Sequence, residues 1–96
     1  MKRAYWIAFY RSISDKEKLA AYAAQALPAI KAAGGSFLAR GMPDAVQEAG
    51  ENNRTVIVQF DSLEAALAAY DSPAYQKALA ALGDGTVRDL RIIEAA

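Results

Sequence analysis

The sequence predicts an α+β fold in which two strand-helix-strand halves share one antiparallel sheet. Three observations support this prediction. The elements follow the order β-α-β-β-α-β, the two halves are nearly equal in length, and 96 residues with 54% hydrophobic content suit one small core. We therefore expect a single ferredoxin-like domain over residues 1–96, a split βαβ sandwich with strand order 4-1-3-2 and with the helices on one face.

The first strand is predicted over residues 4–11, which are rich in aromatic and β-branched types. Both of its faces are apolar, because Tyr5, Ile7 and Phe9 alternate with other large or small apolar residues. Helices on one side leave the opposite face bare in a monomer, so we expect a homodimer that covers it. If the odd positions of this strand face the helices, the dimer-interface candidates are Trp6, Ala8, Tyr10 and Ile57.

The first helix is predicted between Ser14 and the Gly34-Gly35 pair. Ser14 and Glu17 have the spacing of a capping box, and apolar residues then recur every three or four positions. The glycine pair supplies a left-handed stop. Pro28 lies inside this helix and predicts either a kink near Ala24 or two shorter helical pieces.

The second half repeats the plan with a break in its helix. Asp61 and Glu64 indicate a second capping arrangement, and Ser72-Pro73 restarts the helix because Ser is a good cap and Pro suits the first helical position. The remaining predicted elements are strands at 36–40, 54–60 and 87–94, a small strand at 45–48 within the loop 42–53, and a helix at 73–82.

Composition excludes several kinds of site. The chain has no His and no Cys, so it cannot build an imidazole base, a Ser-His-Asp triad, a thiolate nucleophile, a His-ligated haem or a typical zinc site. We expect no metal and no cofactor. Eleven basic and eleven acidic residues give a formal net charge of zero, which argues against nucleic acid as a partner. The sequence contains no apolar run long enough for a membrane helix and no signal-peptide pattern, so we expect no membrane partner and a cytoplasmic protein.

Two segments of the sequence resemble a known family. A strand of the form Gly34-Gly35…Leu38-Ala39-Arg40-Gly41 is followed downstream by Tyr70-Asp71-Ser72-Pro73-Ala74-Tyr75. This combination is similar to the domain-of-unknown-function 1330 family along almost the whole chain. The resemblance implies a dimeric α+β barrel of ferredoxin-like subunits, in a superfamily that also holds cofactor-free monooxygenases, haem enzymes and isomerases. It implies no particular reaction.

Four residues are candidates for ligand binding: Arg40, Tyr70, Asp71 and Tyr75. Arg40 resembles the strand-borne Arg of the family, and its planar guanidinium suits a carboxylate or an enolate. The phenols and the carboxylate lie where the second helix is interrupted and could orient a small aromatic or keto acid, with a Tyr as proton donor. All of them except Asp71 also have a structural explanation, Arg40 as an exposed strand-end cation and the tyrosines as core residues with a solvated hydroxyl.

The sequence leaves three classes of function open. The first is a small soluble protein that binds an anionic or aromatic carbonyl compound in a pocket between helices and sheet. The second is a structural, assembly or stress-related dimer with no catalytic activity. The third is a cofactor-free enzyme of the monooxygenase or isomerase type, whose catalytic residues the sequence does not indicate. A cavity lined by the candidate residues would favour ligand binding, whereas a filled core would favour an assembly role.

Overall fold

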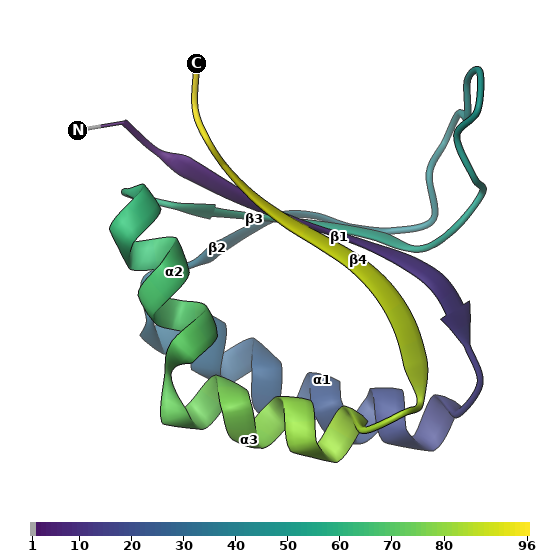
Figure 1. Ribbon diagram of the computed structural model, residues 1–96, viewed down its shortest axis with the longest axis horizontal. Helices are drawn as coiled ribbons and strands as arrows, with labels where there is room; N and C mark the ends of the chain where they lie inside the picture. Colours follow the sequence, from purple (N-terminus) through teal and green to yellow (C-terminus); the bar gives the residue numbers. More distant parts are fainter. Residues whose placement is uncertain (1) are drawn as a thin grey trace.

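The protein forms one four-stranded antiparallel sheet with its helices on a single face, in a computed structural model that describes residues 2–96 (Figure 1). The strand order is β2-β3-β1-β4, so the predicted order and the α+β ferredoxin-like fold are confirmed. The elements are β1 (Ala4–Ile13), α1 (Lys16–Ala32), β2 (Ser36–Gly41), β3 (Thr55–Phe60), α2 (Leu63–Asp71), α3 (Pro73–Leu82) and β4 (Thr86–Glu94).

The faces of β1 are the reverse of those assumed for the dimer interface. Trp6, Ala8 and Tyr10 are 1%, 2% and 5% exposed and belong to the core beneath the helices, so their expected place on the bare face is wrong. The even positions face inward because Trp6 fits among the aromatic rings of β3, α2 and α3. Ile57 does lie on the uncovered face, directly opposite Ile7 of β1.

The uncovered face therefore carries the odd positions of β1 and the residues that pair with them. Tyr5 pairs with Ile93, Ile7 with Arg91 and Phe9 with Asp89. Arg91 and Asp89 form an ion pair of 3.1 Å, and Arg11 also pairs with Asp89 at 3.2 Å.

Helix α1 is one continuous segment of 17 residues, so the division into two pieces is wrong. Pro28 and Ala24 both lie on its exposed side, where water can bind the carbonyl that Pro28 leaves without a partner. Its N-cap is Asp15 rather than Ser14, because the Asp15 carboxylate accepts the N–H groups of Glu17 and Lys18 at 3.0 and 3.1 Å. Ser14 instead donates to the backbone before β4.

The break between α2 and α3 confirms the restart at Ser72-Pro73. The Ser72 hydroxyl accepts the N–H of Tyr75 at 3.2 Å, and Pro73 occupies the first turn. The cap of α2 is Ser62, one residue after the predicted Asp61, because its hydroxyl accepts the N–H of Ala65 at 3.1 Å. Residues 42–54 form a protruding loop without the small strand expected at 45–48 (Figure 1).

The described helices are all too short or too polar to cross a bilayer.

Gly35 provides a test of how closely α1 packs on the sheet. A Cβ at this position would lie 2.5 Å from Cγ2 of Ile30 and 2.9 Å from both Cζ of Phe60 and Cγ1 of Val58. We predict that Gly35→Ala lowers the free energy of unfolding by about 1–3 kcal/mol, because these buried side chains cannot move apart without strain. Urea denaturation measures the change, and Ser36→Ala, at the exposed neighbouring position, is the matched control. Equal stability of the two variants would contradict the prediction.

Candidate functional site

A cavity of about 500 Å³ lies between α1 and the helix-facing side of the sheet. Its walls are mainly apolar side chains from β1, β2, β3 and α1, and its polar groups include three guanidiniums, the Lys16 ammonium and the hydroxyls of Tyr10 and Tyr22. The residues that line it are Trp6, Ala8, Tyr10, Ile13, Lys16, Leu19, Ala20, Tyr22, Ala23, Ala26, Leu27, Ile30, Phe37, Arg40, Met42, Arg54, Val56, Val58 and Arg88. The volume suits a small organic molecule.

The strand register places arginines on both sides of Tyr10. Arg88 of β4 pairs with Tyr10 directly, and Arg54, immediately before β3, accepts the Tyr10 N–H with its carbonyl at 2.9 Å. The guanidinium carbons of Arg54 and Arg88 lie 5.8 and 5.5 Å from the centre of the Tyr10 ring. Both distances are within the range of cation–π attraction.

Arg40 is the third guanidinium of the cavity. It pairs with Val56 across β2 and β3, and its guanidinium carbon lies 5.5 Å from the centre of the Phe37 ring. Arg40 is exposed, as expected for a cation at the end of a strand, and it also lines the cavity. The two predicted roles of Arg40, exposed cation and ligand-binding residue, are therefore compatible.

These guanidiniums lack acidic partners. Within residues 2–96 the ion pairs are Arg11–Asp89, Arg91–Asp89 and Lys18–Asp84, all outside the cavity, and none of the lining residues is Asp or Glu. Nε of Arg54 is buried and has no hydrogen-bond partner. The positive charge of the three guanidiniums is therefore not balanced by an acidic side chain among the described lining residues.

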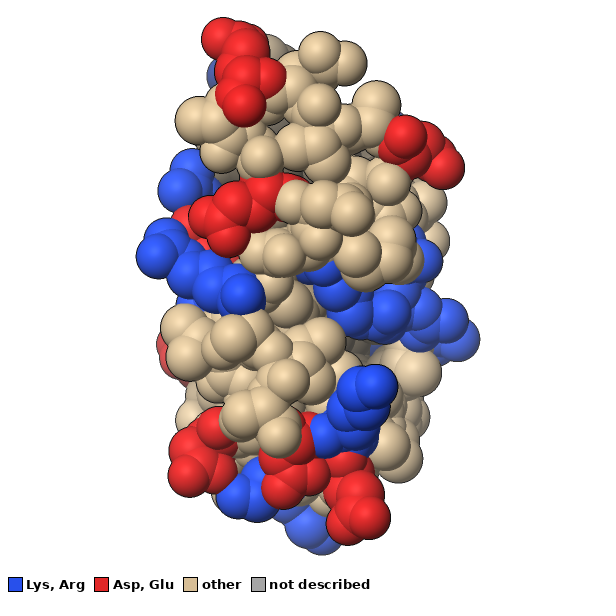
Figure 2. Space-filling model, turned by 90° about the vertical axis from the view of Figure 1, so that its right-hand side faces the viewer, with Lys and Arg blue, Asp and Glu red and all other residues tan. Residues whose placement is uncertain are grey.

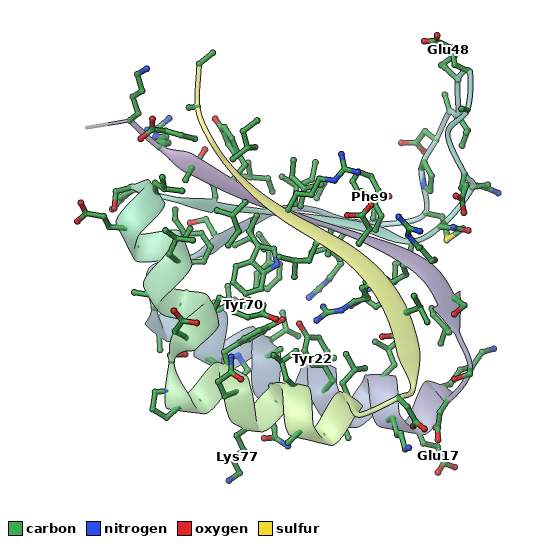
Figure 3. All side chains as sticks on the ribbon, viewed as in Figure 1. Phe9, Glu17, Tyr22, Glu48, Tyr70 and Lys77 are labelled. Carbon is green, nitrogen blue, oxygen red and sulfur yellow. The ribbon has the colours of Figure 1, made fainter. Side chains whose placement is uncertain are left out.

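Arg88 is held by two phenols. Its NH1 and NH2 donate to the hydroxyl oxygens of Tyr22 and Tyr75 at 3.0 and 3.1 Å, and the two hydroxyls lie 2.8 Å from each other. Its guanidinium carbon also lies 4.8 Å from the centre of the Tyr22 ring. In Figure 3, Tyr22 extends from α1 into the space between the helices and the sheet. The cluster joins α1, α3 and β4 at one end of the cavity.

The phenols of the cluster stay protonated. Burial is the main cause that raises the pKa of Tyr22 above its ordinary value, and repulsion from Tyr75 adds to it. Burial likewise raises the pKa of Tyr75, although Arg88 opposes the shift. Burial alone would lower the pKa of Arg88, but its two phenol partners outweigh this effect and raise it. The cluster is therefore a cation with two neutral hydroxyls at physiological pH.

The structure brings only part of the predicted site together. Arg40 lines the cavity, and Tyr75 lies behind it as a partner of Arg88. Tyr70 packs on Trp6 and Tyr75 and lines a separate hollow together with Asp71, which is exposed. The convergence of Tyr70 and Asp71 with Arg40 is therefore wrong, because the helix break turns them toward β4 and not toward α1.

Sequence reasoning missed Tyr22, Arg54 and Arg88. For Arg88 a signal was available: positions 88, 90 and 92 alternate with the paired Asp89 and Arg91, and two of the three are apolar. An Arg in the inward set of a strand marks a charge near the core. Tyr22 has the spacing of an ordinary core residue, and Arg54 precedes its strand, so neither had a distinctive signal.

Figure 2 shows the end of the molecule that carries the loop 42–54. Basic side chains gather around the middle of this face, and acidic side chains lie mainly above and below them, with some basic side chains among the lower ones. The charges of the chain are balanced in number, but several basic side chains lie together on this face. Local positive potential is therefore available without a basic net charge.

The raised pKa values predict a loss of stability in alkali. The unfolded phenols ionise near pH 10.0, whereas the folded Tyr22 and Tyr75 ionise at higher pH. The stability that depends on the protonated phenols is complete below about pH 10 and is lost as the pH rises above it, by up to about 1.4 kcal/mol per pH unit for each phenol. Urea denaturation between pH 9 and 11 should show a shallower decline in the Tyr22→Phe/Tyr75→Phe variant. Parallel slopes above pH 10 would contradict the prediction, and parallel slopes from pH 6 to 9 are the control.

Comparison with solved structures supports the fold. The chain is similar to RPA0582, a protein of unknown function from Rhodopseudomonas palustris, with a TM-score of 0.77 and 15% identity over 99% of this chain and 83% of that one. It is also similar to SnoaB, a cofactor-independent oxygenase from Streptomyces nogalater, with a TM-score of 0.68 and 12% identity over 100% and 95% of the two chains. A third similar structure is that of a putative antibiotic biosynthesis monooxygenase from Caulobacter crescentus. Its TM-score is 0.62, with 16% identity over 99% of this chain and 91% of that one.

No curated protein matches the chain. The family comparison is decisive, because the match covers nearly every residue and agrees with the observed fold. The chain belongs to the DUF1330 family, a domain of unknown function, which it matches over residues 3–96.

Proposed function

We propose that the protein binds a small organic anion in the cavity between α1 and the sheet. The observation that carries this proposal is the set of guanidiniums on one apolar cavity without an acidic partner among its lining residues. A carboxylate is the matching group, because its two oxygens accept the parallel N–H groups of a guanidinium.

The body of the ligand should be flat and apolar. Aromatic rings such as Trp6 and Phe37, together with alanines and larger aliphatic side chains, supply most of the cavity wall, and 500 Å³ is in the range of pockets for small ligands. An aromatic carboxylate or carbonyl compound meets both demands, since its ring contacts the wall and its charge meets the guanidiniums.

Two other classes of function are compatible with the family. An assembly or stress-related dimer would need no cavity, so the open volume supports ligand binding instead. Among enzymes, isomerase-like proton abstraction has little support, since the described lining residues include no carboxylate base. A cofactor-free oxygenase, in which the substrate anion itself supplies the electrons, is the better second candidate, because the fold is similar to that of SnoaB. Oxygen uptake with 1,4-dihydroxy-2-naphthoate, above the spontaneous rate, would favour this candidate.

We also propose that the protein is a cytoplasmic homodimer that assembles through the uncovered sheet face. Ile57, Ile7 and Ile93 form an apolar centre there, and Phe9 is 39% exposed on the same face. A second copy would remove this apolar surface from water. The added burial would stabilise a chain whose own core is small.

Arg54→Met should weaken binding of 4-phenylbutanoate by about tenfold or more, because the apolar side chain keeps its volume but loses the charge. Isothermal titration calorimetry on the folded proteins measures the difference. Arg91→Met is the matched control, since Arg91 lies on the other face and should leave the affinity unchanged. Arg40→Met should also weaken binding of 4-phenylbutanoate. An equal loss in all three variants, or no binding to the wild type, would contradict the proposal.

Light scattering coupled to size exclusion should give about twice 10.3 kDa at micromolar protein. Ile57→Glu should give monomers, because a carboxylate at the centre of the interface would be buried without a partner. Leu67→Glu is the control, since Leu67 is 47% exposed on α2 and lies among the helices. A wild type that elutes as a monomer would exclude this dimer.

A further inference from the structure

The Tyr22–Tyr75–Arg88 cluster contains one hydroxyl proton more than it uses. Each phenol oxygen accepts one N–H from Arg88, and the two hydroxyls share one hydrogen bond of 2.8 Å. Two phenols carry two protons, and that shared bond consumes one of them. Within residues 2–96 neither hydroxyl has a further acceptor, so one O–H remains free to donate.

Access to the cavity determines which hydroxyl keeps the free proton. Both tyrosines are buried, but Tyr75 is packed against the rings of Trp6, Tyr22 and Tyr70, whereas Tyr22 lines the cavity. If Tyr22 donated to Tyr75, the buried Tyr75 hydroxyl would hold a proton with no acceptor, at a cost of about 1–3 kcal/mol. The reverse direction satisfies Tyr75 fully, because it then accepts from Arg88 and donates to Tyr22.

In that arrangement Tyr22 can act only as a donor to a third group. Its oxygen already accepts from NH1 of Arg88 and from the Tyr75 hydroxyl, which fills both of its lone pairs. Arg88 also polarises the phenol, since a hydroxyl that accepts from a cation donates more strongly. The free O–H belongs to a residue of the cavity wall.

We propose that Tyr22 donates its hydroxyl proton in a hydrogen bond to a carbonyl oxygen of the bound ligand. This inference rests on the proposed function and narrows it: the ligand is an aromatic keto acid, with its carboxylate at Arg54 and Arg40 and its ketone at Tyr22. Arg88 and Tyr75 are positioning residues in this arrangement, because they orient the Tyr22 hydroxyl and need not touch the ligand.

A pair of probes that differ in one group tests the assignment. The ketone 4-oxo-4-phenylbutanoate and its analogue 4-phenylbutanoate share carboxylate, chain length and ring, and differ only by a carbonyl in place of a methylene. Calorimetry should show that the wild type binds the ketone about tenfold more tightly, which corresponds to one well-made hydrogen bond to a polarised donor.

Variants then assign the preference to one hydroxyl. Tyr22→Phe should bring the ratio of the two affinities close to one, whereas Tyr75→Phe should lower the ratio only in part, since Tyr22 keeps its proton and its contact with Arg88 but loses one of the two groups that orient it. As a measurement that needs no variant, the infrared band of the ¹³C-labelled ketone in the wild-type complex should lie below its frequency in an apolar solvent.

The outcomes separate this inference from the proposed function. Equal affinity of the wild type for both probes, an unchanged ratio in Tyr22→Phe, or an unshifted ketone band overturns the role of Tyr22. In each of these cases, weaker binding of both probes by Arg54→Met still supports the anion site. Failure of both probes to bind the wild type overturns the anion site and the role of Tyr22 together.

Discussion

The inward packing of Trp6 is the constraint on which the rest of the structure depends. Its ring stacks on Phe60 at 6.0 Å between centroids and meets the edge of Tyr75 at 4.9 Å, so the middle of β1 is fixed against both β3 and α3. Because side chains alternate along a strand, this choice also turns Ala8 and Tyr10 inward and leaves Ile7 outward. The cavity and the uncovered face are both consequences of that single choice.

Register carries the effect of Trp6 to the charged groups. Once Tyr10 faces the helices, its neighbours across the sheet face them as well. These neighbours are Arg54 and Arg88, which therefore lie at the cavity. A guanidinium in such a place is expensive to bury. The structure offsets part of this cost for Arg88 with two phenol oxygens and two aromatic faces, and not with a carboxylate. The positive charge is thereby retained and not neutralised.

The sequence alone was sufficient for the order of elements and the strand order, because capping residues, glycines and periodicity are local signals. It was insufficient for the face of β1, since both faces are apolar and alternation cannot choose between them. The cap of α1 moved from Ser14 to Asp15 because Gly85 offers Ser14 another partner, 71 residues away. The residues of the candidate site could be predicted only in part, because contacts between distant segments bring several of them together. Arg40 and Tyr75 lie in recognisable segments, whereas Tyr22 and Arg88 meet only through tertiary contacts.

The alanines of α1 have a further consequence for how this protein can change. Ala20, Ala23 and Ala26 form part of the cavity wall, so the available space depends on side chains that end at Cβ. A larger residue at one of them would reshape the interior while the arginines, the phenols and the sheet register stayed in place. The alanines of α1 thus set the size of the ligand that fits, whereas the charged and hydroxyl groups that would bind it lie mostly on the strands and at other positions. Relatives with this scaffold can diverge in what they accept through single substitutions on one helix, without altering the groups that hold the charge.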